Sequence, residues 1–372
     1  MHNKILTMFL VGMALFTTGC GTTTPPQSKQ PIKLGATLAL TGKFAFMGEA
    51  ERRGLEMGVA DFNAQGGVNG RPLQLIAEDN QGDAKTGVTT VQKLLDVDNI
   101  DILYSAFTHV TQAIKETIAN SEKIMLYHSA INDIAVNNKN FFKDYIDIQD
   151  HTKTLLSAIQ ARGITSIKLL SEKSDVCDPF EQIIQNTAPT LGITVTQSEK
   201  YSGEDLKTPL TKLKNNNATL VTCAWKNTPT LMKELTELGM IDTQTFQFIP
   251  PFFPSGDTPE MHRLYEENKT VASWYGSGKG ELAENFVQNF KQRYNEEPRT
   301  DSFYTYDEVF VIGNALKQCT TESAVDWECT REAMKKTNYT GVAGNITFDE
   351  NKVSIRKTFL IESKGGKWEE TQ

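Results

Sequence analysis

The sequence predicts an α/β protein with two doubly wound, Rossmann-like lobes. Apolar, β-rich segments alternate with segments of helical periodicity along most of the chain. Strands that alternate with helices of about 10–15 residues form parallel sheets with helices on both faces. Without the first 19 residues, about 350 remain, which is more than one ordinary hydrophobic core requires and enough for two.

The first set of elements is recognised by its periodicity and by its turns. Leu55, Val59 and Phe62 recur at the spacing of one helix face. A glycine-rich cluster at 66–70 then marks a turn. The expected elements are strand 32–40, loop 41–47, helix 48–63, strand 72–77, helix 86–95, strand 101–104, helix 111–121 and strand 124–127.

A second set follows a break near 141–148. The expected elements are helix 151–162, strand 167–170, helix 179–191, a strand at Val195, helix 206–214, strand 220–222, helix 230–238 and strand 246–249. In doubly wound folds the loops at the carboxyl ends of the strands form the ligand crevice. Those loops are 41–47, 105–110, 128–133, 172–178, 223–228 and 250–256.

The N-terminus predicts export. A basic Lys4 precedes an apolar run over 5–16, which is too short to span a bilayer. Small residues and then Cys20 follow, a pattern that resembles a bacterial lipoprotein signal over 1–19, although Thr17 stands where leucine is usual. We expect Cys20 to carry a lipid and 20–31 to be a polar tether, which places the protein outside the cytoplasm, in the periplasm or at the cell surface. The alternative is an ordinary secretory signal cut nearby.

The charge and the motifs exclude several classes of function. The chain has a formal net charge of −8, and loss of Lys4 with the signal makes it −9. An acidic protein is a poor partner for nucleic acid or anionic lipid, so we expect contact with a membrane through the lipid anchor only. No C-x-x-C spacing, His-x-x-x-His spacing, phosphate loop or dinucleotide glycine fingerprint occurs, so the sequence predicts no metal site and no cofactor.

Four cysteines remain after Cys20, and export makes disulfides permissible. Cys319 and Cys329 are ten positions apart and flank a polar loop between two helical stretches, so they are a candidate bridge. Cys177 and Cys223 each follow a strand-like run and pair only if those strands are neighbours. The alternative for this second pair is two free, buried thiols.

Several motifs together resemble a known family. They are Leu40-Thr-Gly42, the run Asn-Ala-Gln-Gly-Gly-Val-Asn-Gly at 63–70, Tyr306-Asp307 and Gly-Asn-Ile-Thr-Phe-Asp at 344–349. The chain resembles the branched-chain amino-acid type of periplasmic binding protein over about 32–369. This resemblance implies the type I fold, with two lobes that are joined by three crossovers and close on a small ligand. It also implies delivery of that ligand to an ABC-type permease in the membrane. The matching lobe limits are 32–147 with 275–350, and 148–274 with 351–372.

The resemblance implies polar ligand contacts in two loops of the first lobe. Thr108, which follows Phe107, matches the hydroxyl that binds the ligand carboxylate, and the alternative is that it only caps the helix that follows. Ser129 and Ala130 match a second element through their backbone groups, whereas Ile131 replaces its threonine and cannot donate a hydrogen bond. His128 stands where proline is common, and it either contacts ligand or is a satisfied loop histidine.

Apolar and aromatic walls are expected around these groups. Phe46 and Met47 lie in the first loop, and Val176 follows Asp175 where the family often has Tyr-Gly. Trp225 and Phe252 follow later strands and either line the pocket or pack in the core. We therefore expect a small ligand with a carboxylate or amide and an apolar or aromatic body, an amino acid or a related compound.

Three functions compete at this level. A lipid-anchored receptor for an ABC importer is the first, and a sensor of the same fold that signals to a membrane partner is the second. An exported enzyme would need Cys177 or Asp175 to work with a histidine on the opposite, moving lobe. No Gly-x-Ser-x-Gly element occurs either, so we expect no enzymatic activity.

Overall fold

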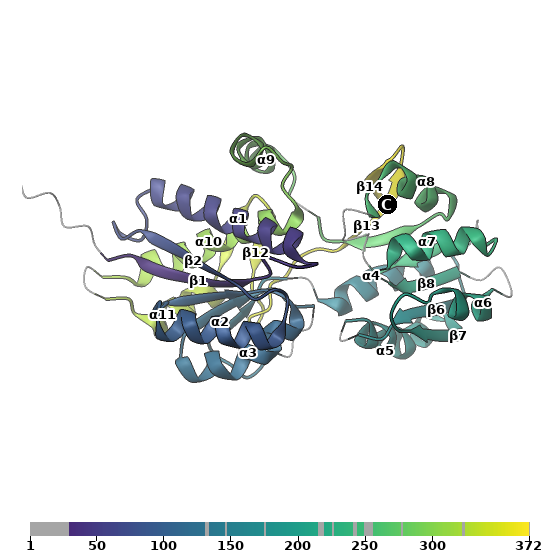
Figure 1. Ribbon diagram of the computed structural model, residues 1–372, viewed down its shortest axis with the longest axis horizontal. Coiled ribbons are helices and arrows are strands. Elements are labelled where there is room, and N and C mark those ends of the chain that lie inside the picture. The colour runs from purple at the N-terminus through teal and green to yellow at the C-terminus, as the bar shows by residue number, and fades with distance from the viewer. Residues whose placement is uncertain are drawn as a thin grey trace, which may run out of the picture.

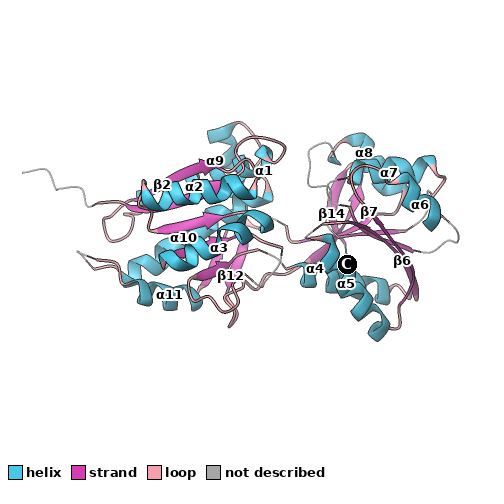
Figure 2. Cartoon of the chain, turned by 60° about the horizontal axis from the view of Figure 1, so that its bottom comes forward, coloured by secondary structure: helices cyan, strands magenta, loops and turns pink. Residues whose placement is uncertain are grey.

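The computed structural model describes residues 30–130, 134–145, 147–174, 176–214, 219–224, 227–240, 244–248, 256–276, 278–321 and 324–371. These residues form two lobes that lie next to each other along the long axis of the molecule (Figure 1). Each lobe has its own sheet, with helices on both faces (Figure 2). Within the described residues, no helix has both the length and the apolar character that crossing a membrane requires.

The first lobe contains a five-stranded parallel sheet in the order β2-β1-β3-β4-β5. Helices α2 and α3 cover one face, and α1, α10 and α11 cover the other. The strands are β1 (Ile32–Leu38), β2 (Leu73–Asp79), β3 (Ile102–Ser105), β4 (Ile124–Tyr127) and β5 (Phe141–Lys143), and a separate hairpin pairs β11 (Asn338–Gly341) with β12 (Gly344–Thr347). The helices are α1 (Ala45–Ala64), α2 (Ala84–Asp96), α3 (Thr108–Ser121), α9 (Glu281–Tyr294), α10 (Thr300–Cys319) and α11 (Trp327–Lys335).

The second lobe contains a seven-stranded sheet in the order β14-β13-β10-β9-β8-β6-β7, in which β13 is antiparallel to both of its neighbours, β10 and the edge strand β14. Helices α4 and α5 pack on one face, and α6, α7 and α8 on the other (Figure 2). The strands are β6 (Ser166–Glu172), β7 (Thr194–Tyr201), β8 (Thr219–Cys223), β9 (Thr245–Gln247), β10 (Val271–Trp274), β13 (Phe359–Lys364) and β14 (Lys367–Thr371). The helices are α4 (Ile148–Ala161), α5 (Cys177–Thr187), a 3-10 turn η1 (Ala188–Leu191), α6 (Lys207–Leu213), α7 (Thr228–Glu237) and α8 (Pro259–Glu267).

The chain passes between the lobes three times, after β5, after β10 and before β13. Helices α1 and α10 are far apart in sequence and pack side by side in the first lobe (Figure 1). The predicted α/β fold, with two doubly wound lobes joined by three crossovers, is thereby confirmed.

Helices α1 and α3 each begin three residues earlier than the sequence predicted. Helix α1 starts at Ala45 and α3 at Thr108, so the expected loops are shorter. The N-cap residues are Phe44 and Phe107, and neither makes a side-chain capping hydrogen bond. Ser, Thr, Asp and Asn are the residues that mark a helix start in a sequence, so these two starts carried no such signal. Phe46 and Met47 therefore lie in the first turn of α1 rather than in a loop.

Both cysteine pairs form disulfides. The bond between Cys319 and Cys329, with 5.5 Å between their Cα atoms, joins the end of α10 to α11. The bond between Cys177 and Cys223, with 5.6 Å between their Cα atoms, joins the start of α5 to the end of β8. Strands β6 and β8 are neighbours in the sheet, which is the condition that the sequence analysis set for the second bridge.

Candidate functional site

A small polar group lies where β3 and β4 end. The Thr108 hydroxyl is 3.1 Å from the Ser129 hydroxyl, and the Ala130 backbone N–H donates to the Thr108 oxygen at 3.2 Å. Thr108 is the first residue of α3, and Ser129 and Ala130 follow β4 closely. The structure thus brings together the three residues of the two loops that were expected to bind the polar end of a ligand. Thr108 and Ser129 are buried, so the surrounding side chains restrict their positions.

The start of α3 favours an anion. Phe107 has φ +67° and ψ +125°, a backbone conformation that is uncommon for a residue other than glycine. Such strain costs about 1–3 kcal/mol and is concentrated at functional sites. Since Phe107 provides no side-chain cap, backbone N–H groups in the first turn of α3 are left to solvent or to a ligand. A carboxylate at this helix start gains from both the N–H groups and the helix dipole.

Apolar side chains connect this polar group to the second lobe. Met47 and Phe44 belong to one buried cluster with Phe180 and Phe248 of the second lobe, and Phe46, Phe107 and Val176 pack against that cluster. The rings of Phe44 and Phe107 are 5.1 Å apart. The Arg299 guanidinium lies 4.9 Å from the centre of the Phe46 ring. Phe44 was not singled out from the sequence, although its position in the loop over 41–47 was a signal for it.

His128 lies inside the first lobe rather than between the lobes. It is only 3% exposed, and its Nε2 atom lies 2.8 Å from Glu308 Oε1. Its Nδ1 atom lies 2.9 Å from the Tyr104 hydroxyl and 3.6 Å from Glu51 Oε1. With both ring nitrogens protonated, Nε2–H donates to Glu308 and Nδ1–H donates to the Tyr104 oxygen, whose O–H donates to Glu51. This position favours the satisfied histidine over a contact with ligand from the cleft.

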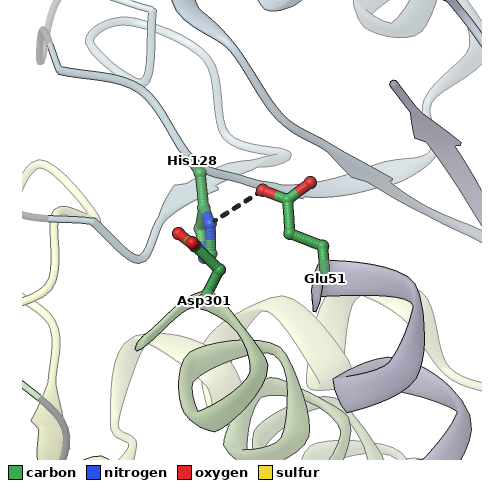
Figure 3. Close-up of side chains that lie close together, drawn as sticks. All are labelled: Glu51, His128 and Asp301. Carbon is green, nitrogen blue, oxygen red and sulfur yellow. Dashed lines mark ion pairs between the residues drawn. The ribbon is translucent and has the colours of Figure 1, made fainter. Parts of the chain in front are cut away.

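Acidic side chains surround His128, and the sequence analysis did not find them. Glu51 from α1 and Asp301 from α10 point toward its ring (Figure 3). Burial raises the pKa of Glu51, of Asp301 and of Glu308. Burial opposes the charge of His128, but the charge of Glu308 outweighs it and raises the pKa of His128. Asp301 and Glu308 are seven positions apart on α10, but Glu51 and His128 come from distant parts of the chain, so no spacing in the sequence linked the four residues.

The three crossovers are tied to one another close to this cluster. Arg356, just before β13, donates to both carboxylate oxygens of Asp144, just after β5, at 2.8 and 2.6 Å. Burial alone would raise the pKa of Asp144, but the Arg356 charge lowers it below its usual range. The Tyr145 hydroxyl is hydrogen-bonded to that of Tyr275, which follows β10. Hinge segments from both lobes thus share one buried polar contact region.

Four expected functional residues lie outside the described residues: Cys20, Asp175, Trp225 and Phe252. Ile131, the departure from the family pattern, also lies outside them. Their expected roles stay predictions.

Comparison with known proteins decides the family. The family model described as Periplasmic binding protein matches residues 31–367, which is nearly the whole chain after the N-terminal segment. The chain belongs to the periplasmic binding protein family. The names of the relatives agree with the resemblance to the branched-chain amino-acid type. Leu/Ile/Val-binding protein homolog 7 of Brucella abortus is 20% identical over 365 residues, which cover 91% of this chain and 89% of that protein.

Two relatives match this chain at higher sequence identity, but only over a short segment. Leu/Ile/Val-binding protein homolog 2 of Brucella abortus is 39% identical over 64 residues, and the match spans only 17% of each chain. The Leu/Ile/Val-binding protein of Escherichia coli is 36% identical over 66 residues, or 18% of each chain. The family assignment therefore rests on the match along the whole chain.

Solved structures of periplasmic binding proteins confirm the type I fold. The branched-chain amino acid transporter substrate binding protein LivJ from Streptococcus pneumoniae, in complex with isoleucine, has a TM-score of 0.78 at 18% identity and covers 91% of this chain and 98% of its own. An ABC transporter substrate-binding protein from Desulfitobacterium hafniense in complex with Leu has a TM-score of 0.75 at 17% identity, with 92% and 100% coverage. The names of these relatives describe binding proteins rather than enzymes.

Proposed function

We propose that this protein is a lipid-anchored, extracytoplasmic solute-binding protein that closes on a small ligand and delivers it to an ABC importer. The observation that carries the proposal is the arrangement of Thr108, Ser129 and Ala130 at the start of α3. That start has no side-chain cap, so it offers donors to an anion. The relatives named above as Leu/Ile/Val-binding proteins support the same type of ligand.

The ligand that fits these groups has a carboxylate or amide at one end and an apolar or aromatic body. The polar end is held at Thr108 and the adjacent N–H groups, where charge-assisted hydrogen bonds contribute about 1.5–3 kcal/mol each. The body lies against the apolar cluster around Phe107, Met47 and Val176. Pockets of this kind are mostly apolar with a few polar groups that fix orientation. An amino acid or a related compound has this chemistry.

In the proposed closure, the two lobes move as rigid bodies relative to each other. They are 32–147 with 275–350, and 148–274 with 351–372, and they rotate about the crossovers that Asp144, Tyr275 and Arg356 tie together. Closure around the ligand presents a combined surface of both lobes to the permease.

The lipid anchor follows from Cys20 and the apolar segment before it. Replacing Cys20 by serine removes the thiol that takes the lipid. In fractionated cells we expect the C20S variant to leave the membrane fraction and the unchanged protein to stay in it. An unaltered membrane association of C20S would refute the anchor and leave the ligand-binding proposal intact.

The test of ligand binding is a thermal-shift screen with a panel of amino acids, their amides, small aromatic carboxylates and sugars. A ligand at a hundred times its dissociation constant adds about 2.7 kcal/mol to the free energy of unfolding. We expect carboxylates or amides with apolar bodies to raise the melting temperature and to be recovered unchanged after long incubation. A panel in which only sugars raise it would contradict the proposal, and turnover of a ligand would restore the enzyme alternative.

A further inference from the structure

The strongest unexplained feature of the molecule is the buried cluster of Glu51, His128 and Asp301. One potential metal-ligating atom from each residue lies within 4.8 Å of the other two. The residues come from α1, from the segment after β4 and from α10, and their side chains converge at one point (Figure 3). The cluster lies within the first lobe, and none of the proposed contacts with the solute uses it.

Three carboxylate oxygens around His128 have no hydrogen-bond partner among the described residues. Asp301 is 3% exposed and Glu51 is 1% exposed, yet Asp301 Oδ1 and Glu51 Oε2 are both unpartnered. Glu308 Oε2 is a third unpartnered oxygen, on the carboxyl group that holds Nε2 of His128. A buried polar atom without a partner carries its full desolvation cost, which is larger for a charged group. A cation bound in the cluster would offset that cost for the oxygens that reach it.

The imidazole of His128 has the orientation of a metal ligand. Its Nδ1 atom lies on the side of Glu51, 3.6 Å from the Oε1 atom. Its Nε2 atom is held by Glu308 at 2.8 Å. Metal-binding histidines nearly always donate their second ring N–H to a carboxylate in this way, which fixes the tautomer and orients the ring. The Tyr104 hydroxyl is 3.2 Å from Glu51 Oε1 and can donate to Glu51 when Nδ1 binds an ion.

The charge of the cluster also fits a cation. The carboxyl groups of Glu51, Asp301 and Glu308 face a single imidazole in a region closed to water. The nearby Arg356 is already paired with Asp144, and the charge of Arg299 acts on Asp301. A divalent ion would add positive charge beside the three buried carboxyl groups.

We propose that Glu51, His128 and Asp301 bind one divalent transition-metal ion of the Zn²⁺ class, with Glu308 positioning His128. An imidazole nitrogen and two carboxylate oxygens suit such an ion better than Ca²⁺ or Mg²⁺, which prefer oxygen ligands alone. Zinc binds these atoms at about 2.0–2.2 Å, so atoms separated as in this cluster need small side-chain movements to reach it.

The ion would connect the parts of the first lobe that hold the ligand loop. His128 immediately precedes Ser129 and Ala130, whose groups meet Thr108. An ion that holds His128 against α1 and α10 therefore fixes the position of that loop. This site is separate from the proposed solute site, and its test needs no knowledge of the solute.

The test uses the mature chain, dialysed against EDTA and then freed of chelator, and titrated with ZnCl₂ in a calorimeter. We expect one ion per chain and a rise in melting temperature with Zn²⁺, which Mg²⁺ does not produce. The D301N and E51Q variants keep the size of each side chain and should weaken Zn²⁺ binding at least about tenfold. Because Asp301 Oδ1 has no hydrogen-bond partner in the described part of the chain, D301N should fold with unchanged circular dichroism.

The matched control is D257N. Asp257 pairs with His262 at 2.8 Å, but it is 60% exposed and lies in the second lobe. D257N should bind Zn²⁺ like the unchanged protein. The absence of a Zn²⁺-induced shift in the unchanged protein would overturn the proposal, and so would equal Zn²⁺ affinity in D301N, E51Q and the unchanged protein. Loss of binding in D257N, with D301N unaffected, would assign the ion to His262 and would equally overturn it.

Discussion

Arg356 and Asp144 join the third crossover to the first through two parallel hydrogen bonds of 2.8 and 2.6 Å. Both side chains are almost fully buried, and the guanidinium also lies 3.8 Å from the centre of the Tyr304 ring. A bidentate pair has fixed geometry, so the two segments keep their relative position. The lobes therefore rotate about a linked set of segments rather than about three independent ones.

Breaking this pair should be costly. Arg356→Met leaves the Asp144 carboxylate buried without its partner, for which we expect a loss of about 3–5 kcal/mol in the free energy of unfolding. Urea denaturation followed by circular dichroism measures it. The matched control is Arg263→Met, since Arg263 pairs with Glu267 on the surface of α8, and such pairs contribute about 0.5 kcal/mol or less. Equal losses in the two variants would contradict the role given to Arg356.

Acid should destabilise the protein partly through His151. This residue is 2% exposed, and its Nδ1–H donates to the Ser273 hydroxyl at 2.9 Å. Burial, with a smaller contribution from the Lys143 charge, lowers its pKa to about 3. The unfolded chain therefore takes up this proton more readily, and the stability that depends on neutral His151 is present above pH 6.5 and lost as the pH falls toward 3.

Between pH 7.5 and pH 5.0 the loss from His151 should be about 2 kcal/mol. The variant His151→Asn keeps a donor at the position of Nδ1 and cannot be protonated. Its free energy of unfolding should therefore fall less over this interval by about that amount. Urea denaturation at the two pH values measures the difference. An identical pH dependence in both proteins would show that His151 is not the group responsible.

Thr108→Val should weaken ligand binding without unfolding the protein. Valine has the shape of threonine but removes the hydroxyl that lies between Ser129 and Ala130. For the carboxylate that gives the largest thermal shift in the screen, we expect about a 10- to 150-fold loss of affinity in calorimetry.

Thr111→Val is the control for that experiment, because Thr111 lies one turn later in α3 and its hydroxyl bonds to Ser105 at 2.9 Å. It should keep the affinity while losing some stability. If both variants bind the ligand as tightly as the unchanged protein does, Thr108 does not contact the ligand and serves only as the first residue of a helix.

The two disulfides should differ in reactivity and in their contribution to stability. Cys177 and Cys223 are fully buried, whereas Cys329 is half-buried, so mild thiol treatment should open the bond between Cys319 and Cys329 first. Alkylation and mass spectrometry would record this order, and the reverse order would contradict it.

The disulfide that closes the longer loop, with a sequence separation of 46 rather than 10, should contribute more to the free energy of unfolding. On the chain-entropy account the contributions are about 4 and about 3 kcal/mol.

The sequence predicted the fold because its motifs have local physical causes. Asn63 both donates to and accepts from Leu73 at 2.8 Å, which explains why an asparagine opens the turn at 63–70. Asp307 accepts from the N–H groups of Val342 and Ala343 at 2.8 and 2.7 Å. A Cβ atom on Gly341 would lie 2.1 Å from the Asp307 carboxylate, so glycine is required there. Asp307 of one motif thus contacts the residues just before the motif at 344–349.

The parts that the sequence did not predict depend on residues far apart in the chain. The start of α3 was missed because Phe107 caps it through an unusual backbone conformation rather than through a polar side chain. The environment of His128 depends on Glu51 and Glu308, which only the packing of α1 against α10 brings to it. Thr108, Ser129 and Ala130 were named from the resemblance, and their loops follow neighbouring strands, an arrangement that alternation along the chain also indicates.

The central claim is that the two lobes close around a solute. Small-angle X-ray scattering of the mature protein, with and without a saturating amount of the solute that gives the largest thermal shift, tests this most directly. We predict a smaller radius of gyration with the solute, and the same decrease in the Thr111→Val variant when it is saturated. Superimposable scattering curves, at a solute concentration where calorimetry shows the site to be full, would contradict the account.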